Sequence, residues 1–155
     1  MKFKQAIEQT PGIEHAYRLG LQAIRRRDRE RISGDRNSRL AGSANLDDAL
    51  QEIYPNEARW DYGIGLVVNQ QADRIVWAEV HPASTSHVKG MINKLKWLKN
   101  WLNTCAPRIK EMETVQFCWI ASGGVRFSKN SRYAKRLAQS GISFPKEHLD
   151  LRHIQ

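Results

Sequence analysis

The sequence is poor in cysteine and contains no long apolar run. Its 155 residues include two cysteines, Cys105 and Cys118, which lack the C-x-x-C spacing of structural zinc sites. We therefore predict neither a disulfide framework nor a structural zinc site, and the chain suits a reducing compartment. No segment approaches the roughly 20 apolar residues that cross a bilayer, and the first residues lack the apolar run of a signal peptide. These absences predict a cytoplasmic protein with no membrane partner.

Internal repeats, low-complexity tracts and clear linkers are also missing from the chain. A chain of 155 residues with 41% hydrophobic content is close to the commonest size of a single domain with its own core. We predict one domain over residues 1–155. It divides into a basic helical N-terminal extension and loop (1–44), a core (45–121), and a C-terminal helix and tail (122–155).

Positive charge is the most prominent feature of the composition. Lys and Arg number 25 against 16 Asp and Glu, which gives a formal net charge of +9. Such an excess favours polyanions, because basic side chains contact phosphates and release counterions. The segment from residue 18 to residue 39 holds eight arginines against three acids, Asp28, Glu30 and Asp35. The arginines are Arg18, Arg25, Arg26, Arg27, Arg29, Arg31, Arg36 and Arg39.

Arginine is well suited to bidentate phosphate binding, so this segment is a candidate nucleic-acid-binding element. The residues we select are Arg25, Arg26, Arg27 and Arg39. The alternative is a solvated helix whose charges pair with one another at i,i+4 spacing.

Apolar spacing predicts helices in the first third of the chain. A first helix continues into the arginine run and ends before Ser33, with apolar positions at Ile13, Tyr17, Leu21 and Ile24. Segment 32–45 is rich in Gly, Ser and Asn and predicts a loop. A short helix over 46–53 follows, with Asn45 as its cap.

The pattern then changes to that of strands. Segments 61–68 and 74–81 are rich in β-branched and aromatic residues, and the short polar link between them predicts an antiparallel hairpin. A helix follows over 86–102, capped by Ser84, Thr85 or Ser86, and 114–121 forms a third strand. The helix between the second and third strands predicts a crossover and therefore a mixed sheet in an α/β fold.

The end of the chain predicts one more helix. Ser128 or Ser131 caps it, and Gly141 closes it. Gly123 and Gly124 precede it and predict a turn after the third strand.

An acid and a histidine stand at the end of the second predicted strand. Glu79 and His81 are two residues apart, so their side chains project from the same face. A hairpin places the start of the first strand, Asp61, beside them. Two carboxylates and the carbonyl of Val80 are oxygen ligands suited to Mg²⁺ or Mn²⁺. The sequence therefore predicts a divalent metal site formed by Asp61, Glu79 and Val80.

This arrangement resembles the PD-(D/E)XK nuclease superfamily, whose members share the restriction-endonuclease-like fold. The resemblance covers roughly residues 45–121: a helix, Asp61, a hairpin, Glu79-Val80-His81, then a helix and a strand. It implies a restriction-endonuclease-like core with a mixed sheet flanked by helices, to which the N-terminal basic helix is added. It also implies that Asp61 and Glu79 bind a divalent metal. The motif that carries the resemblance is short and degenerate.

The chain departs from the family pattern at the motif lysine. His81 stands in that position, and a neutral imidazole cannot supply a permanent positive charge to a scissile phosphate. Similar families supply the lysine from the following helix, where Lys94 flanks the apolar stripe. The resemblance thus implies catalytic roles for Asp61, Glu79, His81 and Lys94.

Each of these residues has a structural alternative. Asp61 can form a surface ion pair with Arg59, worth about 0 to 1 kcal/mol. His81 can end the strand with a hydrogen bond to a carbonyl, and Lys94 can extend its charged end to solvent from a helix flank. Burial is expected for Glu79 because its neighbours are apolar.

Aromatic and histidine residues outside this motif have two interpretations each. Trp97 and Trp101, four residues apart, are packing residues or, if exposed, a surface that stacks bases or binds a partner. A zinc cluster is predicted only if the chain ends meet the core. Its members would be His87, His148 and His153.

The sequence favours a nuclease that acts on nucleic acid phosphodiesters with Mg²⁺ or Mn²⁺. Two other classes stay open. A nuclease-like domain without catalysis is a nucleic-acid-binding or protein-assembly module, and the missing lysine supports it. The basic segment can instead dock an acidic protein partner, as in an antitoxin or inhibitor, with Trp97 and Trp101 at the contact.

Overall fold

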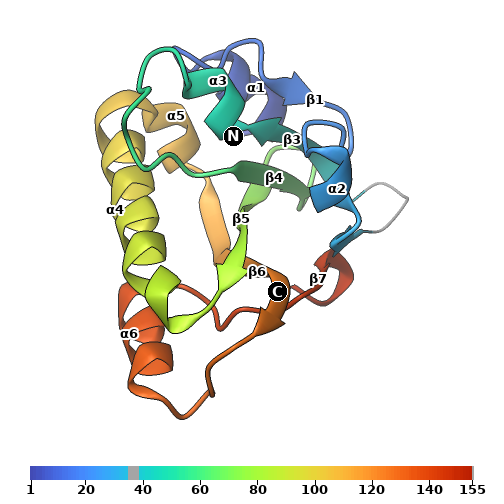
Figure 1. The fold of residues 1–155 in the computed structure, drawn as a ribbon. Coiled ribbons are helices and arrows are strands. Elements are labelled where there is room, and N and C mark those ends of the chain that lie inside the picture. The colour runs from blue at the N-terminus through green and yellow to red at the C-terminus, as the bar shows by residue number, and fades with distance from the viewer. Residues whose placement is uncertain (35–38, 155) are drawn as a thin grey trace.

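The fold is a mixed β-sheet covered by helices, as Figure 1 shows for the computed structural model, which describes residues 1–34 and 39–154. Five strands form the sheet in the order β1-β3-β4-β5-β6, and β2 and β7 form a second, two-stranded sheet. The strands are β1 (Tyr17–Arg18), β2 (Ile32–Ser33), β3 (Leu40–Asn45), β4 (Tyr62–Val67), β5 (Asp73–Ala83), β6 (Glu113–Val125) and β7 (Leu149–Asp150). The predicted α/β class with a mixed sheet is confirmed.

Six α-helices and two short 3₁₀ helices complete the described chain. The α-helices are α1 (Phe3–Glu8), α2 (Arg26–Arg29), α3 (Leu46–Leu50), α4 (Val88–Cys105), α5 (Pro107–Lys110) and α6 (Arg132–Ser140). The 3₁₀ helices are η1 (Thr85–His87) and η2 (Leu151–His153). Within the described residues, no helix has the length and apolar character that a membrane crossing needs.

The hairpin and the crossover are both present as predicted. Strand β4 pairs antiparallel with β5, and Tyr62 lies opposite Ala78. Strand β6 pairs parallel with β5 after the chain has crossed through α4. In the hairpin turn, Asn69 Oδ1 accepts the backbone N–H groups of Gln71 and Ala72, which fixes the link between the two strands.

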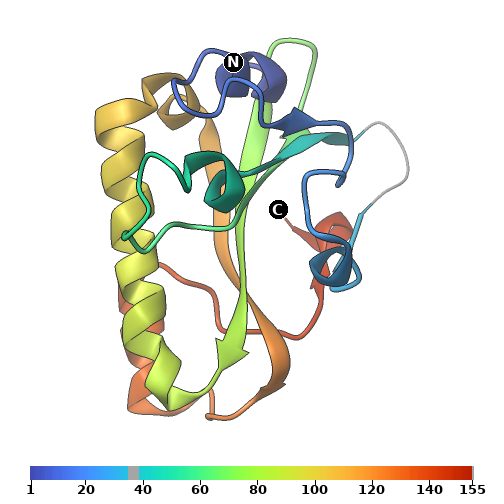
Figure 2. The ribbon, with the colours of Figure 1, turned by 45° about the horizontal axis from the view of Figure 1, so that its top comes forward.

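Each face of the sheet has its own apolar core. Ile75 and Trp77 of β5 pack with α1 and α4, whereas Val76 and Ala78 pack toward β2 and β7 on the other side. Figure 2 shows α4 along one side of the sheet and the β2–β7 pair on the other. This alternation follows from the two-residue period of a strand. It also places Glu79, which follows in the Ile75 and Trp77 series, on the α4 side.

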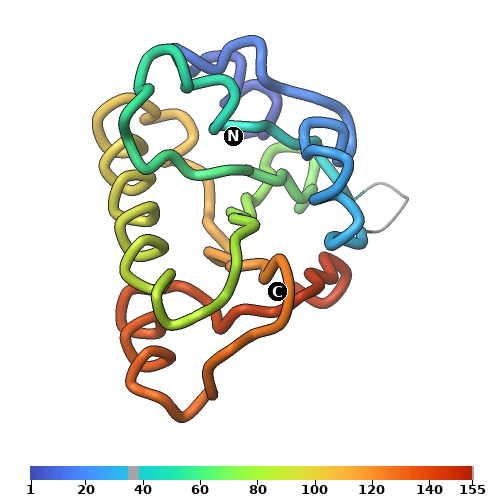
Figure 3. The backbone as a smooth tube through the Cα atoms, viewed as in Figure 1, coloured from blue at the N-terminus to red at the C-terminus, as the bar shows by residue number. Residues whose placement is uncertain are grey.

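The N-terminal basic helix is not formed. The chain has a β-strand at Tyr17–Arg18 and a helix of only four residues, Arg26–Arg29, where one long helix was predicted. Gly20 explains the break, because its φ of 52° lies in the left-handed region that a right-handed helix excludes. Ile13 and Ile24 are both buried, but in the two different cores, so their helical spacing is coincidental. Figure 3 traces this irregular path from the N-terminus to β3.

The loop predicted over 32–45 is wrong at both ends, because Ile32–Ser33 forms β2 and Leu40–Asn45 forms β3 within the sheet. Small residues are needed there because β3 lies close against β1: a side chain at Gly42 would collide with the ring of Tyr17. Asp35 and Arg36, which were counted in the basic segment, lie outside the described residues.

The remaining helices agree with their sequence signals in most details. Asn45 caps α3 by accepting the N–H of Asp48, and Ser131 caps α6 by accepting the N–H of Ala134. Gly141 closes α6 with a φ of 98°. The cap predicted before α4 is wrong. Ser84 stands immediately before η1 and makes no capping hydrogen bond with its side chain, and the residue immediately before α4 is His87.

Candidate active site

Asp61 and Glu79 face one another across the β4–β5 pair. Tyr62 is registered with Ala78, so Asp61, one residue before β4, lies opposite Glu79. The backbone N–H of Asp61 donates to Glu79 Oε1 at 2.9 Å, and the N–H of Val80 donates to Asp61 Oδ2 at 3.1 Å. Each carboxylate is thus held by the strand that carries the other one.

Lys94 of α4 completes this group. Its Nζ lies 3.1 Å from Glu79 Oε2 and donates to the carbonyl of Arg59 at 3.1 Å. The Glu79 side chain is 1% exposed and that of Lys94 is 22% exposed. The lysine therefore reaches the carboxylates from the helix that follows their strand, as the sequence predicted for its position.

Both carboxyl groups are difficult to ionise in this environment. Burial raises the pKa of Glu79 well above its usual range, and the neighbouring Asp61 raises it further, while Lys94 opposes both effects. Burial also raises the pKa of Asp61, against the lowering effects of the Val80 N–H and Lys94. The two carboxyl groups interact directly, and the charge of Asp61 makes Glu79 harder to ionise.

A cleft of about 440 Å³ opens beside this pair. Asp61, Glu79, Val80, His81 and Lys94 all line it, so the structure brings together the residues named for catalysis and for the Mg²⁺ or Mn²⁺ site. The cleft is also bordered by Arg25, Arg27, Asp28, Arg31, Asp47, Pro82 and Ser122. The lining is strongly polar and carries both signs of charge.

The donor set fits a hard divalent cation. Asp61 and Glu79 offer carboxylate oxygens at a cleft, and Mg²⁺ is commonly bound by one or two carboxylates while it keeps several waters. A cation there would also relieve the repulsion that now raises the pKa of Glu79. Among residues 1–34 and 39–154, no group of three or more His, Cys, Asp or Glu side chains is placed to hold a metal. The fit therefore rests on two carboxylates, with Val80 at the lining of the cleft.

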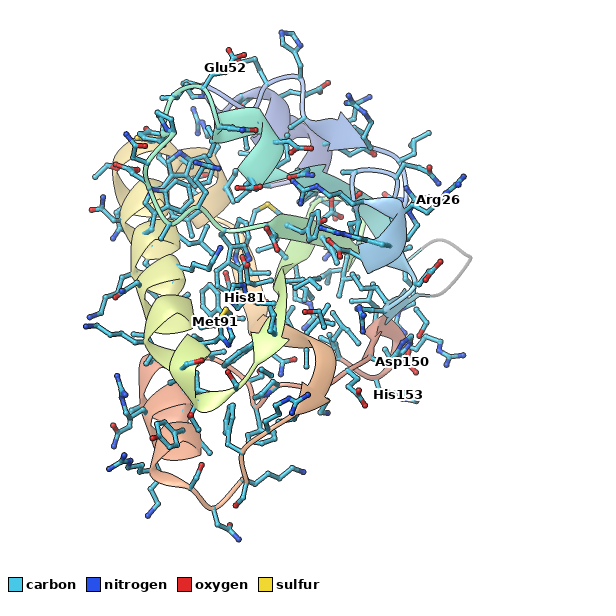
Figure 4. The ribbon with its side chains drawn as sticks, viewed as in Figure 1. Arg26, Glu52, His81, Met91, Asp150 and His153 are labelled. Atoms are coloured by element: carbon cyan, nitrogen blue, oxygen red, sulfur yellow. The ribbon has the colours of Figure 1, made fainter. Side chains whose placement is uncertain are left out.

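His81 lies at the cleft near the centre of the molecule in Figure 4. Its ring is 4.8 Å from that of His87, and burial together with Lys94 and His87 lowers its pKa to about 4. The imidazole is therefore neutral at pH 7. Its backbone carbonyl accepts the indole N–H of Trp119 at 3.0 Å, which fixes the end of β5 against β6.

The four arginines predicted to bind nucleic acid are dispersed. Arg25 and Arg27 line the cleft, whereas Arg26 projects from the outer side of α2 in Figure 4. Arg39 precedes β3, at the opposite end of β4 from Asp61. Its backbone carbonyl accepts the N–H of Val67. The sequence segment thus does not form one basic surface.

Arg25 is engaged in the fold itself. Its guanidinium lies 3.1 Å from Asp47 and 2.7 Å from Asp48, and it also donates to the Tyr62 hydroxyl. Asp47 in turn pairs with Arg59 at 3.0 Å. Within the described chain, Arg59 therefore pairs with Asp47 and not with Asp61, so the surface ion pair considered for Asp61 is not formed.

No pattern in the sequence indicated that Asp28 would lie at this cleft. It is buried in α2, and its Oδ2 accepts the hydroxyl of Tyr62 at 2.5 Å. Its position in an arginine-rich run indicated only a charge partner, because the turn that brings α2 over the end of β4 has no local sequence pattern. Asp47, two residues after the α3 cap Asn45, was not indicated by the sequence for the same reason.

The tryptophan pair serves packing. The rings of Trp97 and Trp101 stack at a centroid distance of 6.0 Å, Trp101 is buried, and the Trp97 indole donates to Glu57. Tyr54 packs edge-on against Trp97. These contacts hold the segment before β4 against α4.

The three histidines considered for a conditional zinc cluster each have a different partner. His87 contacts Ser84, His148 contacts Ser33, and His153 lies 3.5 Å from Asp150. Figure 4 shows His153 and Asp150 at the edge of the molecule, away from His81.

Comparisons with protein-family models, curated proteins and solved structures found no match to this chain. A function can therefore be proposed for this chain only from the geometry of the cleft.

Proposed function

We propose that this protein is a divalent-metal-dependent nuclease of the PD-(D/E)XK type, acting on nucleic acid phosphodiesters. The single observation that carries the proposal is the pairing of Asp61 and Glu79 at a polar cleft, with Lys94 3.1 Å from Glu79. Two crowded acids of raised pKa at a cleft are typical of a functional site, because a purely structural position gains nothing from such repulsion.

The order of the strands supports the same proposal. An antiparallel β4–β5 pair carries the two acids, α4 carries the lysine, and β6 returns parallel to β5. This is the arrangement of acids, helix and strand on which the resemblance to the superfamily rests. The restriction-endonuclease-like fold is accordingly part of the proposal.

The residues of the cleft have distinct roles in this proposal. Asp61 and Glu79, with the Val80 carbonyl, would hold Mg²⁺ or Mn²⁺. When bound there, the cation supplies Lewis-acid chemistry, lowering the pKa of water and neutralising charge on the phosphate. Lys94 contributes the positive charge that His81 lacks. His81, neutral at pH 7, accepts a hydrogen bond and so orients a water molecule in the cleft.

A cleavage assay tests the proposal. Labelled single-stranded DNA, duplex DNA and RNA are incubated with the purified protein in Mg²⁺, Mn²⁺ or EDTA. We expect cleavage that requires the metal and that falls at least about 100-fold in Glu79→Gln and in Lys94→Met, since each removes charge stabilisation from the reacting phosphate.

Matched controls separate these effects from general damage. Glu52→Gln removes an exposed carboxylate, and Lys96→Met removes an exposed charge from the same helix as Lys94. Both should retain cleavage within about threefold, a difference of under about 1 kcal/mol in the barrier. If the wild-type protein cleaves none of the three substrates with either metal, the proposal is wrong.

A second candidate is a nucleic-acid-binding module without catalysis. Both oxygens of Glu79 have protein partners, the Asp61 N–H and Lys94, so the acid can also serve as a structural anchor. The absence of a lysine at position 81 favours the same candidate. It predicts binding without cleavage. It also predicts that Glu79→Gln destabilises the folded protein.

A further inference from the structure

The net positive charge of the protein lies almost entirely in one continuous segment. Residues 1–79 contain twelve basic and twelve acidic residues, whereas residues 80–146 contain twelve basic and two acidic ones. The arginine-rich segment is therefore balanced by acids within its own half of the chain. The surplus comes from α4, α5, the end of β6 and α6.

Most of this surplus is exposed and free of acidic partners. Of the twelve basic residues in 80–146, all except Lys94 are exposed. They are Lys89, Lys96, Lys99, Arg108, Lys110, Arg126, Lys129, Arg132, Lys135, Arg136 and Lys146. In the part of the chain that the structure describes, Arg108 is the one member of this set within 4.0 Å of an acid, Glu111.

The arginines of the first half are used differently. Arg25 pairs with Asp47 and Asp48, and Arg29 donates to the carbonyl of Ile24. Arg31 donates to the carbonyl of Ala121 at 3.3 Å. A guanidinium that already holds a carboxylate or a carbonyl must give up that contact before it can bind a phosphate.

A second pocket extends the cleft toward this charged segment. It has a volume of about 280 Å³ and shares Pro82 and Ser122 with the cleft. His87 and Arg126 line it, together with Ser84 and the two glycines at the end of β6. Side chains at Gly123 and Gly124 would meet no heavy atom within 4 Å, so the strand end leaves this pocket open.

Helix α6 lies next to the second pocket. The Tyr133 hydroxyl lies near Thr85, the residue next to Ser84 of the pocket. Arg132 stacks over the ring of Tyr133, 5.0 Å from its centroid. Helical spacing places Arg132 and Arg136 on one face of α6, because residues four apart are neighbours on a helix. Figures 1 and 2 show α6 beside the N-terminal part of α4.

We propose that the phosphodiester backbone of the nucleic acid passes from the cleft through the second pocket onto α6. Its principal protein contacts are Arg126 in the pocket and Arg132 and Arg136 on α6. The proposal rests on the proposed function for the end of the path that lies in the cleft. Three exposed arginines without acidic partners, arranged outward from the reacting centre, match the repeating negative charge of such a backbone. The arginine-rich segment then contributes mainly to the wall of the cleft.

Binding measurements on charge variants test the path. Fluorescence anisotropy with labelled single-stranded DNA, duplex DNA and RNA in EDTA measures affinity without cleavage. The triple variant Arg126→Ala, Arg132→Ala, Arg136→Ala should bind the preferred probe about 10- to 100-fold more weakly. The slope of log affinity against log salt concentration should become shallower by up to about three, about one for each lost phosphate contact.

Two control variants define the location. Lys96→Ala, Arg108→Ala, Lys110→Ala removes the same charge from α4 and α5, and α5 lies beyond the far end of the 18-residue α4, which is about 27 Å long. Arg26→Ala removes the arginine that projects from the outer side of α2, and Arg25 and Arg27 are retained because both line the cleft. Both controls should bind within about threefold of the wild type, because binding through phosphates depends on local contacts more than on net charge.

The possible outcomes distinguish this inference from the proposed function. Wild-type binding that the α6 triple variant retains would overturn the path, even if the protein cleaves nucleic acid. Wild-type protein that binds none of the probes at low salt, or that binds polyglutamate equally well, would also overturn it. Loss of binding in the triple variant, with no cleavage by the wild type in Mn²⁺, would support the path and contradict the proposed nuclease activity.

Discussion

Glu79 has the most informative surroundings of any residue in the cleft. Asp61 faces it from the start of β4 and Lys94 from α4, and His81 follows it on the same strand. With one lysine between two carboxyl groups, one negative charge lacks a cationic partner when both acids are ionised. The repulsion and the burial together explain why the pKa of Glu79 lies well above its usual range.

This raised pKa predicts a stability that falls as the pH rises in the metal-free protein. The folded state holds a proton that the unfolded chain releases near pH 4.5, so the free energy of unfolding decreases from there through the pKa of the folded state. Glu79→Gln removes the effect. We expect the variant to gain stability relative to the wild type with rising pH, by up to about 1.4 kcal/mol per pH unit.

Chemical denaturation at several pH values in EDTA measures this difference. His81, whose low pKa has the opposite effect in acid, is present in both proteins and cancels in the comparison. A variant that is less stable by about 1 to 3 kcal/mol at every pH would instead identify Glu79 as a structural anchor for the Asp61 N–H and Lys94. That result would favour the binding module without catalysis.

Among the elements, those with a strong periodic pattern and a clear cap were predictable. The β4–β5 hairpin, α4, β6 and α6 lie where alternation, an apolar stripe or a capping serine places them. The elements of the first 45 residues were not, because they depend on distant partners. A side chain at Gly42 in β3 would clash with Tyr17 of β1, and no local sequence pattern predicts that contact.

The candidate site shows the same division. Asp61, Glu79, His81 and Lys94 could be predicted because the strand register and helical spacing fix their positions. Asp28 and the second pocket could not, since they depend on how α2 and the end of β6 fold over the sheet. The charge surplus of 80–146 is visible in the sequence, yet its bases are spread over 58 residues from Lys89 to Lys146, whereas the arginine run is compact.

Two glycines in these elements make a direct test of the packing. Gly65 in β4 faces Phe3 of α1, and a side chain there would overlap the phenyl ring. Gly90 in α4 faces open space. We expect Gly65→Ala to destabilise the protein by about 1 to 3 kcal/mol through overpacking. Gly90→Ala should stabilise it by about 0.5 to 1 kcal/mol, because alanine loses less backbone entropy in a helix.

Urea unfolding of both variants measures these changes. Equal effects on stability would show that α1 does not rest on β4 as the structure describes. The comparison is independent of metal and nucleic acid, so it tests the fold alone.

For the molecule as a whole, the account joins two separate charge arrangements. The cleft holds acids and bases in near balance, and the surface formed by residues 80–146 carries a positive surplus. The first arrangement suits a bound cation, and the second suits a phosphate backbone that extends outward from it. Cleavage of the bound backbone depends on a metal at Asp61 and Glu79, whereas binding to the positive surface does not.

A crystal structure of the protein soaked with Mn²⁺ tests this central claim most directly. Anomalous diffraction locates manganese independently of any assay of activity. We predict one strong peak in the cleft, within about 2.6 Å of an oxygen of both Asp61 and Glu79, which is the range for oxygen ligands of such cations. A peak missing from the cleft at saturating Mn²⁺, with the Glu79–Lys94 contact unchanged, would contradict the account.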